Sequence, residues 1–131
     1  MRYVVLTLIC GLLIIAGTGC NKSARSLNHK AMMQMQDQDF AGALATYEEA
    51  LQLEPDSKVL LFGKAEALYK LERYEEALPL FEEFIKKADP ERAVYRDEIF
   101  DAEFYRDKCK QTLGETVEQD PDAIPPPRMG E

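Results

Sequence analysis

Apolar residues along the chain form one continuous run and then a series of periodic stretches. Residues 3–16 make up the run. A helix that spans a bilayer needs about 20 such residues, so this shorter run is typical of the core of a signal peptide. Further on, apolar side chains recur every three or four positions, as in Leu61, Ala65 and Leu68 and then Tyr74, Ala77, Leu78, Phe81 and Ile85. That spacing predicts amphipathic helices.

A second level of pattern is a repeat with a period of 34 residues. Five pairs of similar residues carry it: Phe40 and Tyr74, Ala43 and Ala77, Leu44 and Leu78, Tyr47 and Phe81, and Leu51 and Ile85. A 34-residue period with small and aromatic residues in this order resembles the tetratricopeptide repeat (TPR), in which antiparallel helix pairs stack into a solenoid. The resemblance covers residues 40–88 clearly. It departs from the family at Phe84, where Ala is usual.

Residues that cap helices place the expected boundaries. Asp39 suits an N-cap, Asp89 and Pro90 suit a cap and a first helical residue, and Gly114 suits a terminating position. Residues 90–113 contain a further helical stripe, which predicts one long helix that covers the end of the repeats. The expected fold class is therefore all-α: a short TPR-type solenoid over residues 27–113, made of two helix pairs and a C-terminal capping helix.

The two ends of the chain predict different properties. Gly17, Thr18 and Gly19 lead into Cys20, which resembles a bacterial lipoprotein signal. The resemblance implies removal of residues 1–19, lipidation of Cys20 with acyl chains such as palmitate, and a tether over residues 20–26. Ordinary secretory cleavage after Gly19 and an uncleaved anchor remain the alternatives. At the other end, residues 114–131 are acidic and rich in proline, and this composition predicts a disordered tail.

Localisation follows from the same resemblance. A lipidated chain is expected in the bacterial cell envelope, held at the membrane by its acyl chains. If the organism has two membranes, Asn21 lacks the Asp that the family associates with inner-membrane retention, which favours the outer membrane, facing the periplasm.

The net charge and the scarcity of reactive residues reduce the number of functions that the sequence can support. After residue 19 the chain has 15 basic and 24 acidic side chains, a net charge of −9. Nucleic-acid binding depends on clustered Lys and Arg, so nucleic acid is not an expected partner. With one His and one Cys after Cys20, no metal cluster or catalytic triad stands out. We therefore expect a protein that is not an enzyme, without a metal or cofactor. Cys109 suits either a packing thiol or a disulfide between molecules.

The first helices of TPR solenoids form a concave groove that holds a peptide or a partner helix. Carrying those positions across gives candidate binding residues from two helices: Asn28, Met32 and Met35 from the first, and Val59, Phe62, Glu66 and Tyr69 from the third. Flexible methionines beside aromatic rings make an adaptable apolar surface. The same residues could instead pack the core, and the pattern does not separate the two interpretations.

The resulting hypothesis is a lipid-anchored adaptor or assembly factor that binds another envelope protein through its groove. The alternative is a carrier that encloses a small apolar ligand or lipid between the helices.

Overall fold

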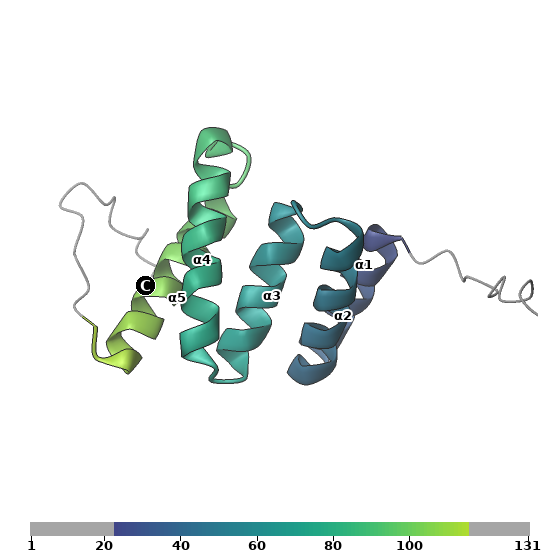
Figure 1. Cartoon of the computed structure of the whole chain (residues 1–131), viewed down its shortest axis with the longest axis horizontal. Coiled ribbons are helices and arrows are strands. Elements are labelled where there is room, and N and C mark those ends of the chain that lie inside the picture. The colour runs from purple at the N-terminus through teal and green to yellow at the C-terminus, as the bar shows by residue number, and fades with distance from the viewer. Residues whose placement is uncertain (1–22, 116–131) are drawn as a thin grey trace, which may run out of the picture.

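The computed structural model describes residues 23–115 and consists of five α-helices and one short 3₁₀ helix (Figure 1). The helices are α1 (Ala24–Gln36), α2 (Phe40–Leu53), α3 (Lys58–Lys70), α4 (Tyr74–Ala88), η1 (Asp89–Glu91) and α5 (Arg96–Leu113). No strand occurs within residues 23–115. The expected all-α, TPR-type fold is confirmed.

The helices form a row in which each packs chiefly on the next one along the chain. Figure 1 shows α1 at one end of the row and α5 at the other. Among the described helices that are not consecutive, the main additional contacts are those of α1 with α3 and of α3 with α5. This alternation places α1, α3 and α5 as the first helices of successive pairs, with α2 and α4 as the second helices.

The turns inside the two helix pairs are equivalent in backbone conformation. Gln38 and Glu72 both adopt positive φ, at 61° and 60°, and they are 34 residues apart. Each precedes the start of a second helix by two residues. Positive φ is uncommon for residues other than Gly and marks a tight change of direction. The repeat predicted from side chains is therefore present in the backbone as well.

Two predicted helix boundaries are confirmed at the level of single residues. The Asp39 side chain caps α2, because its Oδ1 accepts a hydrogen bond from the Gly42 amide at 3.0 Å. Gly114 ends α5 with a left-handed φ of 75°. Pro79 lies on the exposed side of α4, and the helix continues through it.

Two other boundaries differ from the expectation. The fifth helix was expected from Pro90, but Asp89–Glu91 form a 3₁₀ turn and α5 begins only at Arg96. At the other end, α1 begins at Ala24, where Ser23 caps it by accepting from the Ser26 amide at 3.2 Å. The helix therefore includes residues 24–26, which were expected to belong to the tether.

Several predictions lie outside the described residues. They are the signal peptide over residues 1–19, lipidation of Cys20, the start of the tether and most of the acidic tail. Within residues 23–115, no helix has both the length and the apolar character that crossing a bilayer requires.

Candidate functional site

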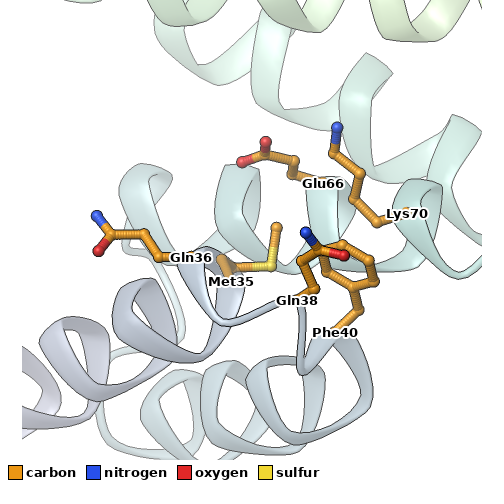
Figure 2. Close-up of a pocket in the computed structure, with 6 residues that line it drawn as sticks. All are labelled: Met35, Gln36, Gln38, Phe40, Glu66 and Lys70. Carbon is orange, nitrogen blue, oxygen red and sulfur yellow. The ribbon is translucent and has the colours of Figure 1, made fainter.

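A cavity of about 470 Å³ opens between the C-terminal parts of α1 and α3. Figure 2 shows the side chains that line it: Met35, Gln36, Gln38, Phe40, Glu66 and Lys70. Met35 and Phe40 supply apolar surface, and the remaining four supply two amides and one pair of opposite charges. The lining therefore offers both apolar contact and hydrogen-bonding groups to an occupant.

The turn between α1 and α2 shapes one wall of the cavity. Met35 and Gln36 are in the last turn of α1, and Phe40 is the first residue of α2. Between them, Gln38 takes the positive φ that folds the chain back on itself. The opposite wall comes from α3, where Glu66 and Lys70 are one helical turn apart and thus share a face.

On the cavity wall that α3 forms, burial changes the pKa of Glu66. Partial burial raises the pKa of Glu66, the positive charge of Lys70 opposes that rise, and the negative charge of Asp101 on α5 adds to it. Lys70 Nζ lies 5.8 Å from the centroid of the Tyr105 ring, which also belongs to α5. The charged wall of the cavity is therefore continuous with the surface between α3 and α5.

The structure brings together only part of the predicted groove. Of the predicted residues, Met35 and Glu66 line the cavity. Met32 on α1 and Val59 on α3 are exposed, at 49% and 47%, and Asn28 is half-buried. These three residues are not part of the cavity lining.

Phe62 and Tyr69 have a packing role in the described residues. The Phe62 ring lies 5.1 Å from that of Phe84 and 6.2 Å from that of Phe81, measured between centroids. Tyr69 lies 5.5 Å from Tyr74 and 4.6 Å from Tyr105. Both are half-buried against the core, so their packing interpretation is the one that the contacts support.

Four lining residues were missing from the predicted groove: Gln36, Gln38, Phe40 and Lys70. Lys70 could have been found from its spacing of four residues after Glu66. Phe40 was recognised only as an element of the repeat. The two glutamines carried no sequence signal, because their position depends on the turn that closes the first helix pair.

A second cavity of about 300 Å³ is lined by residues of α4, η1 and α5. Its lining consists of Glu82, Ile85, Lys86, Asp89 and Arg106. Charged side chains thus line both cavities, which is unlike the mostly apolar lining that holds a small apolar ligand. In the part of the chain that the structure describes, no three His, Cys, Asp or Glu residues gather in a way that could hold a metal ion.

Cys109 on α5 is fully buried in the hydrophobic core. Burial raises the pKa of its thiol to about 11, so the thiol is protonated at neutral pH. A protonated, inaccessible thiol is a poor nucleophile. The structure therefore supports the packing role of Cys109 over pairing between molecules.

The fold and the cavity define an all-helical repeat protein with a cleft between successive first helices. Residues 34–96 match the family described as Tetratricopeptide repeat. This match supports the interpretation of the chain as a TPR protein. TPR proteins are typically non-enzymatic modules that bind protein partners, and no catalytic family matches. Neither the curated proteins nor the solved structures contain a match to the chain.

Proposed function

We propose that this protein is a lipid-anchored adaptor of the bacterial envelope that binds a segment of another protein in the cleft between α1 and α3. The lining of that cleft is the observation that carries the proposal. Met35 and Phe40 can contact one apolar side chain of a bound peptide, while Gln36 and Gln38 can pair with its backbone. Glu66 and Lys70 add a charged pair that can select a polar neighbour of that side chain.

The proposed anchor would hold the cleft close to the membrane. Cys20, the lipidation site, is four positions before Ala24, where α1 begins. Even fully extended, four residue steps span only about 14 Å. An acylated Cys20 would therefore present the repeat to partners at the membrane surface, and two or more acyl chains give durable anchoring.

Site-specific photocrosslinking tests the cleft in cells. A photoreactive amino acid replaces Gln36, which lines the cleft, or Gln52, which is exposed on α2 and serves as the matched control. We expect one defined protein adduct from position 36 that is absent from position 52. Adding Glu66→Lys should reduce that adduct several-fold, because it reverses one charge of the lining. Equal adducts from both positions, or an adduct that ignores Glu66→Lys, would overturn the cleft assignment.

Metabolic labelling with a fatty-acid analogue tests the anchor separately. Wild-type chain should incorporate label and remain with membranes, and Cys20→Ala should do neither. Incorporation that persists in Cys20→Ala would show that the anchor is assigned to the wrong residue.

A further inference from the structure

Among residues 23–115, no helix covers the outer face of α5, the last helix of the row. α3 packs on α2 and on α4, whereas α5 packs on α4 and on the edge of α3. Phe100 and Phe104 lie on the uncovered face and are 42% and 52% exposed. Each is two residues from the fully buried Ala102 and so about 200° around the helix from it. These two rings, one turn apart, form an apolar patch on α5.

Charge is divided unevenly along α5. Its first eight residues, 96–103, contain four acidic side chains and one basic one, a net charge of −3. The remaining ten, 104–113, contain three basic side chains and one acidic one, a net charge of +2. An antiparallel copy of the same helix would set each acidic half against a basic half. Opposed helix dipoles would favour the same orientation.

The two halves match residue by residue when Phe100 of one copy faces Phe104 of the other. In that register Asp97 comes within one residue of Lys108 from the other copy, and Arg96 comes within one residue of Asp107. Each of these pairs is separated by eleven residues, which corresponds to 20° around the helix, so both members lie on one flank. A two-fold axis brings each flank against its own copy. On each flank of the patch, acidic residues of one copy therefore lie opposite basic residues of the other.

The geometry points to a second copy of this chain as the occupant of the α5 face, in an antiparallel, two-fold symmetric pair of α5 helices centred on Phe100 and Phe104. Lys108 Nζ already lies 5.7 Å from the centroid of the Phe104 ring, at the border of the patch. Each partner helix would occupy the place of a second helix that would complete a third pair.

Other contacts of α5 agree with this choice of occupant. Partial burial raises the pKa of Asp101, and the negative charges of Asp97 and Glu98 raise it further. Arg92 pairs with Glu103 in this half at 3.4 Å, and the basic half of a second copy would add further positive charges. Residues 116–131 of the same chain are a poorer match, because their net charge of −3 would meet the acidic half of α5.

Crosslinking of isotopically mixed chains tests the pair directly. Full-length protein labelled with ¹⁵N is mixed with unlabelled protein in detergent and treated with a carbodiimide, which joins a carboxylate to an amine in contact. Within one helix, Asp97 and Lys108 are about 16 Å apart, too far to be joined. We expect peptides that join these two residues and carry both isotopes. If only peptides of single isotopic origin form, or if the α5 crosslinks lead to residues 116–131 or to another protein, the proposal is wrong.

Sedimentation of the same full-length chain over tenfold dilutions measures the strength of the pair. Phe104→Ser should weaken dimerisation at least tenfold, whereas Leu53→Ser, which alters an equally exposed residue on α2, should leave it unchanged. Asp97→Lys should weaken it several-fold, and the exchange of both charges in Asp97→Lys/Lys108→Asp should restore it. A chain that is monomeric at every concentration, a dimer that ignores Phe104→Ser, or a failure of the exchanged pair to recover would each overturn the assignment.

Discussion

The α1–α2 pair and the α3–α4 pair share one 34-residue register but fill it with different chemistry. Ala50 in α2 corresponds to Phe84 in α4, and both are fully buried. Thr46, a buried hydroxyl in α2, corresponds to Leu80. Its partner Gln34 in α1 corresponds to Leu68, so the polar contact of the first pair is replaced by two leucines in the second. One backbone arrangement thus accepts two kinds of interior.

The two interiors differ in their content of aromatic rings. Both pairs contain fully buried alanines, such as Ala43 in α2 and Ala77 in α4, and such small side chains allow helix axes to approach closely. In the second pair the rings of Phe62, Phe81 and Phe84 contact one another. The contacts continue to Tyr95, the N-cap residue of α5, and to Tyr105 on α5. The aromatic cluster therefore joins α3, α4 and α5. We expect more of the stability to reside in the second pair.

The largest expected effect comes from Phe84→Ala, which gives the second pair the residue that the first pair has at the same position. The fully buried ring contacts Phe62 and Tyr95, so its removal leaves a cavity. We expect a loss of about 3–5 kcal/mol in the free energy of unfolding, measured by chemical denaturation. Phe104→Ala, which removes an exposed ring, is the control at a concentration where the chain is monomeric. A loss below about 1 kcal/mol for Phe84→Ala would contradict the assigned role of the aromatic cluster.

The next effect concerns the contact between the two pairs, where Tyr47 of α2 packs on Gly63 of α3. A Cβ at position 63 would lie inside van der Waals contact with the Tyr47 ring. Gly→Ala within a helix ordinarily stabilises by about 1 kcal/mol. Here we expect overpacking to prevail, so that Gly63→Ala lowers the free energy of unfolding by about 1–3 kcal/mol. A rise in thermal stability instead would show that the contact between the pairs is loose.

A smaller effect is expected from the polar contact of the first pair. Gln34 Oε1 accepts a hydrogen bond from Thr46 Oγ1 at 2.7 Å, and Gln34 Nε2 donates to Asp39 Oδ2 at 3.2 Å. Gln34→Ala should destabilise the chain by about 1 kcal/mol, since Thr46 keeps the Gly42 carbonyl as a partner at 2.9 Å. Gln36→Ala, at an exposed position in the same helix, is the matched control for a thermal melt. Equal melting temperatures for the two variants would show that the hydrogen bond between Gln34 and Thr46 does not contribute to stability.

The smallest expected effect is a pH dependence of the free energy of unfolding, caused by Glu66 in the second pair. Because burial raises the folded-state pKa of Glu66, the contribution of this group to stability is fully present below its unfolded pKa, near 4.5, and is lost as pH rises through the folded value. Glu66→Gln should therefore be more stable than wild type at pH 7, by less than about 1 kcal/mol. The advantage should shrink as pH falls toward 4. Denaturation at both pH values measures it, and an advantage that grows at low pH would contradict the sign.

The sequence predicts the repeat and its caps well because these depend on local spacing. Phe40 and Tyr74, Asp39 and Gly114 all take the roles that their patterns indicate. The start of α5 was placed too early, since Pro90 can begin a 3₁₀ turn as readily as an α-helix. Local patterns do not distinguish these two outcomes, because contacts with α4 help decide where α5 begins.

The candidate site was harder to predict than the fold. Helical spacing correctly places Phe62 and Tyr69 on the same helix as Glu66, but it does not tell which face meets α4 and α5. The answer depends on the rings of Phe81, Phe84 and Tyr105, which draw both residues into the core. Glu66 is left facing the cleft together with Met35 from another helix.

The contact of Tyr47 with Gly63 has a mechanical consequence. Since each helix is joined chiefly to its neighbour, tension applied between the two ends of the row passes through every helix contact in series. The α2–α3 contact then carries most of the load between the first pair and the second, because α1 and α3 share few contacts. A pull on a partner held in the cleft would load α1 and α3 on either side of that contact, so the packing of Tyr47 on Gly63 would contribute to the force that the folded repeat withstands.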